Sequence, residues 1–144
     1  MPRLLLGLLV LVGCDSAEFD SLPFETVADG RFADTTEPLV VVARSEAEFD
    51  AVVRQHLSRA SVPAPDFGAA IAVFVFHGPS VSGMTELRVD EINAGGGRVR
   101  VRAVGVTPCA ATDDVGSPWA VVTAPRVEGR GVLASLGAEV GACR

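Results

Sequence analysis

Residues 70–76 read Ala-Ile-Ala-Val-Phe-Val-Phe, and this stretch decides the fold. Apolar side chains stand at odd and even positions alike, so both faces of an extended segment would be covered. Seven residues make a strand of ordinary length and are too few for a typical helix. His77, Gly78 and Pro79 then end the run. We therefore predict a central strand over residues 70–76.

Further strands are predicted on both sides of this stretch. Residues 39–43 follow Pro38 and are all apolar and mostly β-branched, which predicts a buried strand. Residues 98–102 alternate arginine and valine, so the valines should face the core and the arginines water. With the alternating residues 85–92 and the Gly-rich turn at 93–97 they form a predicted hairpin. Two more strands are predicted later in the chain, over residues 119–123 and 131–136.

One helix is predicted, over residues 46–58. Ser45 and Glu48 have the spacing of a capping box, and apolar residues follow at helical intervals. We expect Phe49 and Val53 to face the core. Strands outnumber this single helix, so the predicted fold is mainly β (α+β): a small antiparallel β-sandwich or partly open barrel with one α-helix near residues 46–58.

The first residues have the features of an export signal. Arg3 precedes about ten apolar residues, which is typical of a secretory leader and too short for a membrane-spanning helix. Residues 11–14 read Leu-Val-Gly-Cys and resemble the lipobox of bacterial lipoproteins. That resemblance implies cleavage after residue 13, lipidation of Cys14 and anchoring to a membrane of the cell envelope, on its periplasmic or cell-surface face. The alternative is a simple secretion signal with an incidental cysteine.

The predicted organisation is a leader (1–13), an acidic lipidated tether (14–22) and one β-rich domain (23–144). Without the leader the chain loses Arg3, and 11 basic residues face 18 acidic ones, a formal charge of −7. Such an acidic chain is a poor partner for nucleic acid. The chain has no lysine, which excludes Schiff-base and P-loop lysine chemistry.

Two cysteines remain beyond the lipidation site. In an exported domain Cys109 and Cys143 are expected to form a disulfide that closes a loop of about 35 residues. The alternative is a pair of free or buried thiols. A metal site is disfavoured, because neither histidine stands at a ligand spacing from a cysteine.

Catalytic motifs are not evident. The segment 78–83 contains glycines and serines but lacks the spacing and the following helix of a nucleophile elbow. His56 and His77 are isolated and are interpreted as a packed residue and a strand end. Asp113 and Asp114 lack the further oxygen ligands of a calcium loop. We therefore expect no enzyme, no cofactor and no metal. Trp119, the only tryptophan, fits either a core position or a binding hot spot.

The order of these features resembles the C-terminal domain of the PrcB family of protease complex subunits. The likeness covers about residues 24–125. It lies in the helix with Ser-Glu-Ala-Glu-Phe at 45–49, in Pro-Asp-Phe at 65–67 and in the late strand entry Ser-Pro-Trp at 117–119. The family usually has Thr-Gly-Gly-Tyr where this chain has Ser-Gly-Met at 82–84, and Tyr where it has Trp119. The resemblance implies a non-catalytic subunit that accompanies a cell-surface protease.

The leading hypothesis is thus a membrane-anchored accessory or protein-binding module of the envelope, with a protease as the implied partner. The candidate contact residues lie in two loops, at 80–85 and 108–119, and comprise Ser80, Ser82, Gly83, Met84, Thr85 and Trp119. Met84 beside Gly83 is expected to form an adaptable apolar tip. One alternative is a direct protease inhibitor, because the loop at 81–84 is similar to the Gly-containing loop of chagasin-like inhibitors. An envelope hydrolase is the third.

Overall fold

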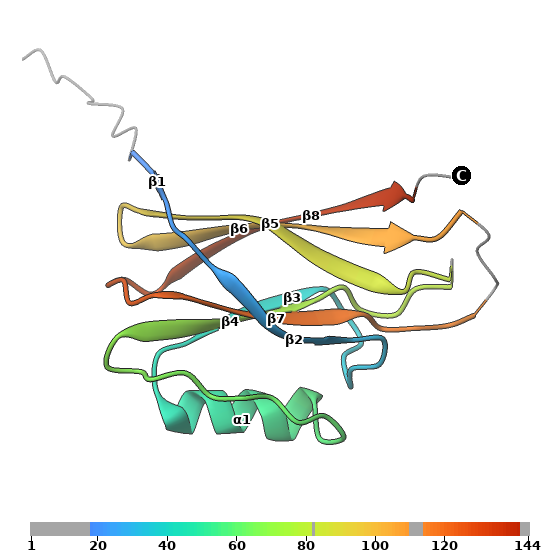
Figure 1. The fold of residues 1–144 in the computed structure, drawn as a ribbon, viewed down its shortest axis with the longest axis horizontal. Helices are drawn as coiled ribbons and strands as arrows, with labels where there is room; N and C mark the ends of the chain where they lie inside the picture. The colour runs from blue at the N-terminus through green and yellow to red at the C-terminus, as the bar shows by residue number, and fades with distance from the viewer. Residues whose placement is uncertain (1–17, 82, 110–113, 142–144) are drawn as a thin grey trace, which may run out of the picture.

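The predicted central strand is β4 (Ala70–Phe76), which lies inside a four-stranded sheet. The computed structural model describes residues 18–81, 83–109 and 114–141. The sheet has the order β2-β7-β4-β3 and is called the inner sheet (Figure 1). Its other strands are β2 (Glu25–Gly30), β7 (Trp119–Pro125) and β3 (Leu39–Ala43).

Both faces of β4 are covered, as the sequence predicts. Ile71, Val73 and Val75 belong to the core between the two sheets, and Phe74 and Phe76 to the core on the opposite side. All five of these side chains, and Ala72 between them, have no exposed surface at all. Because β4 also has hydrogen-bonded neighbours on both edges, it is the most enclosed strand of the molecule's described part.

The second sheet, called the outer sheet, has the order β1-β5-β6-β8. Its strands are β1 (Asp20–Ser21), β5 (Glu86–Gly95), β6 (Arg98–Thr107) and β8 (Gly131–Val140). The predicted hairpin is β5–β6, and it turns at Gly96 and Gly97, whose φ angles of 57° and 72° suit glycine. A bulge after Val89 shifts the register, so that Ile92 also points into the core.

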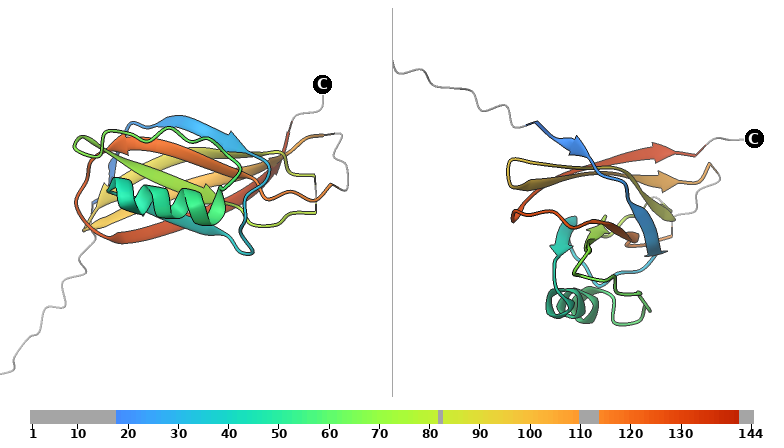
Figure 2. Two further views of the ribbon diagram at one scale, coloured as in Figure 1. Left: turned by 90° about the horizontal axis from the view of Figure 1, so that it is seen from below. Right: turned by 60° about the vertical axis from the view of Figure 1, so that its left-hand side comes forward.

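The helix α1 (Glu46–His56) packs on the face of the inner sheet that points away from the outer sheet, and makes a third layer (Figure 2). Ser45 caps it, because its Oγ accepts a hydrogen bond from the Glu48 N–H at 3.2 Å. Glu48 Oε2 in turn accepts a hydrogen bond of 2.7 Å from the Arg44 N–H. In a standard capping box the donor would be the N–H of the cap residue itself, here Ser45. Phe49 packs on Phe74, with ring centroids 5.2 Å apart.

The structure differs from the sequence-based expectation in several features: β2 was not predicted, and α1 ends at His56, two residues before its predicted end. The sandwich is mixed, because β8 pairs with β6 in parallel, whereas all other strand pairs are antiparallel. β8 also runs to Val140, four residues beyond its predicted end. At the start of the chain, β1 pairs with β5 inside the segment expected to be a tether, which places the boundary of the folded domain before Asp20. The two sheets keep separate edges, so the described chain is a sandwich and not a barrel.

Candidate functional site

Three chain segments are joined by backbone hydrogen bonds at one end of the sandwich, to the right in Figure 1. Ser80 and Gly116 exchange two N–H···O=C bonds, of 2.7 Å and 2.9 Å. Ser117 donates its N–H to the Arg31 carbonyl at 2.7 Å and accepts from the Ala33 N–H at 3.0 Å. The segments around residues 32, 80 and 116 therefore form a small ladder that holds the loops in place.

This ladder exposes three large apolar side chains. Phe32 is 70 % exposed, Val81 72 % and Val115 60 %. Val81 directly follows Ser80 and Val115 directly precedes Gly116, so both valines flank the antiparallel bridge between Ser80 and Gly116. Phe32 comes from the third segment of the same ladder, with the Arg31 guanidinium 5.6 Å from the centre of its ring. We call these three residues the tip surface.

A hollow of about 340 Å³ adjoins the tip surface. Phe32 and Trp119 both line it, together with the start of the loop after α1. Trp119 is only 4 % exposed, and its indole packs so closely on Gly30 that a Cβ there would lie 2.7 Å from Nε1. The tryptophan is thus a core residue that supports the surface, which resolves the two alternatives left open by the sequence.

Met84 does not form the expected exposed tip. It is 4 % exposed, and its thioether sulfur lies against Gly105, where an added Cβ would overlap it. The prediction of an adaptable apolar tip at Met84 is therefore wrong. The reason is that β6 offers a glycine at this point, and the resulting groove accepts the long flexible side chain.

The remaining predicted contact residues serve as supports or lie outside the described part. Ser80 is buried and holds the ladder, and Gly83 is buried with a φ of 70°. Thr85 is half-buried and donates its N–H to Val106. Ser82 lies outside the described residues. Val81 and Val115 belong to the two loops named from the sequence, but neither they nor Phe32 were among the predicted contact residues, because single exposed apolar residues are ordinary on any surface.

The two histidines make local contacts. His56 Nδ1 lies 3.1 Å from the Asp34 carbonyl oxygen, and its ring packs 5.2 Å from that of Phe76. His77 Nδ1 lies 3.3 Å from the Gly78 carbonyl oxygen. Within residues 18–81, 83–109 and 114–141, neither imidazole hydrogen-bonds to a serine hydroxyl or to a carboxylate, which a triad would require. The described part of the chain also holds no group of three or more potential metal-ligating side chains.

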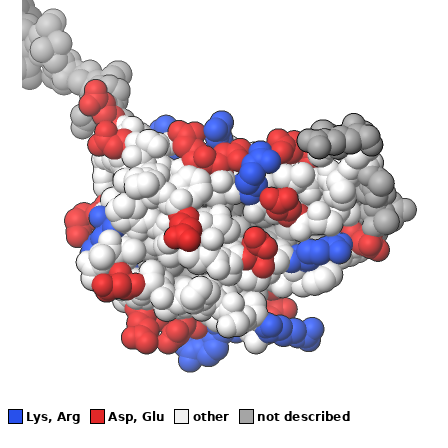
Figure 3. All heavy atoms as spheres, in the orientation of Figure 1, with Lys and Arg blue, Asp and Glu red and all other residues white. Residues whose placement is uncertain are grey.

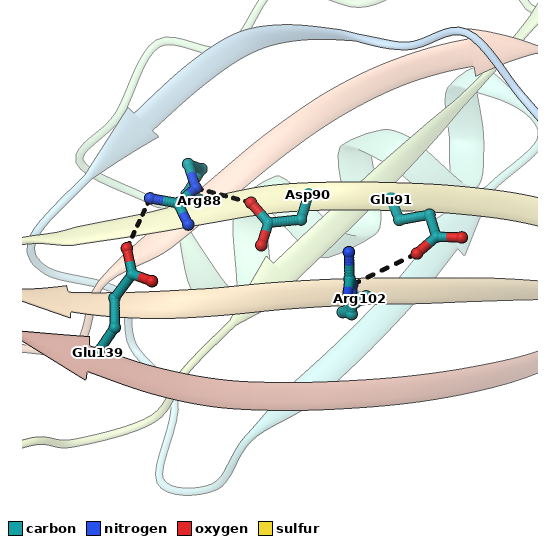
Figure 4. Close-up of polar contacts among 5 residues, drawn as sticks. All are labelled: Arg88, Asp90, Glu91, Arg102 and Glu139. Carbon is teal, nitrogen blue, oxygen red and sulfur yellow. Dashed lines mark hydrogen bonds and ion pairs between the residues drawn. The ribbon is translucent and has the colours of Figure 1, made fainter.

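An arginine-centred network crosses the face of the outer sheet (Figure 4). Arg88 donates to Asp90 at 2.6 Å and reaches over β6 to Glu139 at 2.7 Å. The hydrogen bond from Arg88 lowers the pKa of Asp90, with smaller coulombic contributions from Arg88 and Arg102 and an opposing effect of burial. Glu91 and Arg102 form a separate ion pair at 3.3 Å. The predicted solvated face of β6 is therefore partly neutralised by neighbouring carboxylates.

Cys109 is disulfide-bonded. The two other cysteines of the chain, Cys14 and Cys143, lie outside the described residues, so the expected pairing stays a prediction. The structure around Cys109 favours Cys143 as its disulfide partner. Thr107 pairs with Val140 and accepts a hydrogen bond of 2.8 Å from the Gly141 N–H. The chain thus brings the segments before both cysteines side by side.

None of the helices that the structure describes is long and apolar enough to cross a bilayer. The leader and Cys14 lie outside the described residues. Comparison with protein-family models, with curated proteins and with solved structures finds no match to this chain.

Proposed function

We propose that the chain is a lipid-anchored, non-catalytic binding module of the bacterial envelope that contacts a protein partner through the tip surface. The observation that supports this most is the grouping of Phe32, Val81 and Val115 on a hydrogen-bonded ladder. Apolar side chains held on a rigid backbone lose little entropy on binding, which favours protein recognition. The hollow beside Phe32 offers space for a side chain of the partner.

The chemical class of the partner is a protein surface with exposed apolar side chains. On the face in Figure 3 acidic side chains are widely spread, and basic ones lie singly or beside them. This charge distribution, with a net formal charge of −6, disfavours phosphate-rich ligands. The resemblance to protease complex subunits makes an envelope protease the first partner to test.

Replacing the tip surface tests the proposal. A triple variant, Phe32→Ser with Val81→Ser and Val115→Ser, should fold normally, because all three side chains are already exposed. It should capture at least tenfold less of a protease from detergent-solubilised envelopes, a loss of about 1.4 kcal/mol of binding free energy. Leu39→Ser, which removes an exposed apolar side chain from β3, is the matched control. Equal capture by the folded triple variant would contradict the proposal.

The anchor is tested separately. Cys14→Ala should release the protein from the membrane fraction, because the lipid and not a helix would hold it there. Mass spectrometry of the wild-type mature N-terminus should show an acylated Cys14. An unmodified cysteine at that position would show that the protein is not a lipoprotein.

A direct protease inhibitor is the second candidate, and one observation favours it. The loop that carries Val81 is fixed on both sides, by the Ser80–Gly116 hydrogen bonds and by buried Met84. An exposed apolar side chain next to anchored backbone is what an inhibitor needs to occupy an active-site cleft. Titration against purified proteases of several classes separates the two: an inhibitor abolishes activity at one equivalent, and an accessory subunit leaves it unchanged or raises it.

A further inference from the structure

The strand β8 forms an open edge of the outer sheet that differs from the other three edges of the sandwich. β1, β3 and β2 have two, five and six residues, and β2 also contains a bulge. β8 has ten residues and pairs with β6 without a register shift. It contains no proline and a single charged residue, Glu139. Natural edge strands are usually short, charged or irregular, because a long regular edge accepts another strand.

The open edge presents a regular row of backbone groups. Gly131 and Gly141 direct their N–H groups at β6, to the carbonyls of Gly97 and Thr107. Because alternate residues of a strand face the same neighbour, the even-numbered residues direct their N–H and C=O groups away from β6. These are Val132, Ala134, Leu136, Ala138 and Val140. No strand among the described residues pairs with them.

A charge also points toward this edge. Arg98 pairs with Gly131 across the β6–β8 ladder, and its side chain lies over that glycine, where a Cβ would come within 2.7 Å of Cγ. Arg98 makes no ion pair within the described part of the chain. An acidic side chain on an added strand, opposite Gly131, would therefore meet this guanidinium. The one acidic residue of β8 itself is Glu139, near the other end of the strand.

We propose that β8 pairs antiparallel with β8 of a second copy of the chain, about a two-fold axis at Ser135. In this register Glu139 stands opposite Gly131 of the partner copy and beside that copy's Arg98. The rest of the register also fits, since each larger residue faces a smaller one. The opposed pairs are Leu133 with Gly137, Leu136 with Ala134, and Val132 with Ala138.

The register follows from the backbone and the charges together. In β8 only the even-numbered residues have free backbone hydrogen-bonding groups, so each of them must lie opposite an even-numbered residue of the second copy. When the two strands overlap almost completely, the two-fold axis then passes through either Ser135 or Leu136. An axis at Leu136 would place Glu139 opposite Leu133 and would leave Arg98 without a carboxylate. The axis at Ser135 instead forms two symmetric ion pairs, and joins the outer sheets of the two copies into one continuous sheet. Glu139 keeps its contact with Arg88 on the same face (Figure 4).

Cysteine crosslinking of the full chain tests this register. Ser135→Cys should give a disulfide-linked dimer under mild oxidation, because a non-hydrogen-bonded pair on the axis has its Cα atoms only about 4.5 Å apart. Leu133→Cys is the matched control on the same strand and face. Its two copies would lie about 13 Å apart along the strand and should not crosslink. The wild-type chain gives the background from the native cysteines.

Sedimentation of charge variants gives a second, independent readout. Arg98→Glu or Glu139→Arg should weaken dimerisation about tenfold, since each places like charges together at both ends of the interface. The combined variant should restore it, and Arg102→Glu should leave it unchanged. A monomer at all concentrations, or crosslinking of Leu133→Cys as efficient as that of Ser135→Cys, would overturn the proposal. A strand of another protein on this edge would likewise leave the chain monomeric, and none of these outcomes affects the proposed function of the tip surface.

Discussion

Phe74 lies at the centre of β4 with no exposed surface, in contact with Phe49 of the helix and stacked near Phe76. Its ring belongs to the core between the inner sheet and α1, together with Phe49 and Val52 of the helix. Phe32 has the same ring but is 70 % exposed. Burial and not residue type thus decides which phenylalanine holds the fold and which is free to contact a partner.

We expect Phe74→Ala to lower the free energy of unfolding by about 3–5 kcal/mol, because it removes a buried ring and leaves a cavity. Phe32→Ala, the matched control, should change it by less than about 0.5 kcal/mol. Urea denaturation followed by the fluorescence of Trp119 measures both variants. A loss below about 1 kcal/mol for Phe74→Ala would contradict the position of β4 between two cores.

At the scale of elements, strong local patterns were predicted well. The two-faced run of β4, the alternation of β6 and the cap of α1 each depend on neighbouring residues, and all three are confirmed. β2 was missed, because its residues are mixed in polarity and it pairs with a strand some 95 residues later. The parallel pairing of β8 was missed for the same reason: no local signal names its partner.

Part of the candidate site could be predicted and part could not. The loops at 80–85 and 108–119 were identified from their place between strands, and they do meet through Ser80 and Gly116. Phe32 joins them only because the segment after β2 pairs with Ser117, a contact between residues distant in sequence. Which apolar side chain of a loop is buried also depends on its neighbours, as Met84 and Val81 show.

The ion-pair network on the outer sheet leads to a prediction for how the stability of the fold depends on pH. A pKa of Asp90 that is lower in the folded than in the unfolded chain adds stability above the unfolded value of about 3.9. This contribution is lost as the pH falls through the folded pKa. Asp90→Asn should therefore lose less stability than the wild type between about pH 5 and pH 2.

Thermal unfolding over this pH range measures the difference. Arg88→Gln is the control, because it removes the hydrogen bond that lowers the pKa of Asp90. In that background Asp90→Asn should have little further effect on the pH dependence. If Asp90→Asn and the wild type showed parallel pH profiles, the ion pair would contribute nothing to stability.

For the molecule as a whole, the two sheets and the helix form a scaffold that carries its candidate contact residues at one end. The β5–β6 turn and the β7–β8 connection lie at the other end (Figure 1). Cys109 is disulfide-bonded, follows β6 and belongs to the same end of the sandwich as the tip surface. The stability of the domain and the arrangement of this end of the sandwich are therefore expected to depend on the same covalent bond.

The partner of Cys109 is expected to be Cys143. Cys143→Ser should leave Cys109 as a thiol that reacts with maleimide under denaturing, non-reducing conditions, and should lower the stability by about 3–4 kcal/mol. Cys14→Ser, the control, should leave the thiol of Cys109 protected. Protection of Cys109 that survives Cys143→Ser would show that its partner is a different cysteine.

The most direct test of the central claim places a photoreactive benzophenone side chain at Val81 or Val115 of the full, envelope-bound chain. Both positions should crosslink to the same envelope protein, identified by mass spectrometry, because both flank the Ser80–Gly116 bridge of the tip surface. Glu128, exposed in the connection at the far end of the sandwich, is the control position and should give no such product. If benzophenone at Val81 and Val115 gave no adduct, or only the adducts obtained from Glu128, the proposed role of the tip surface would be contradicted.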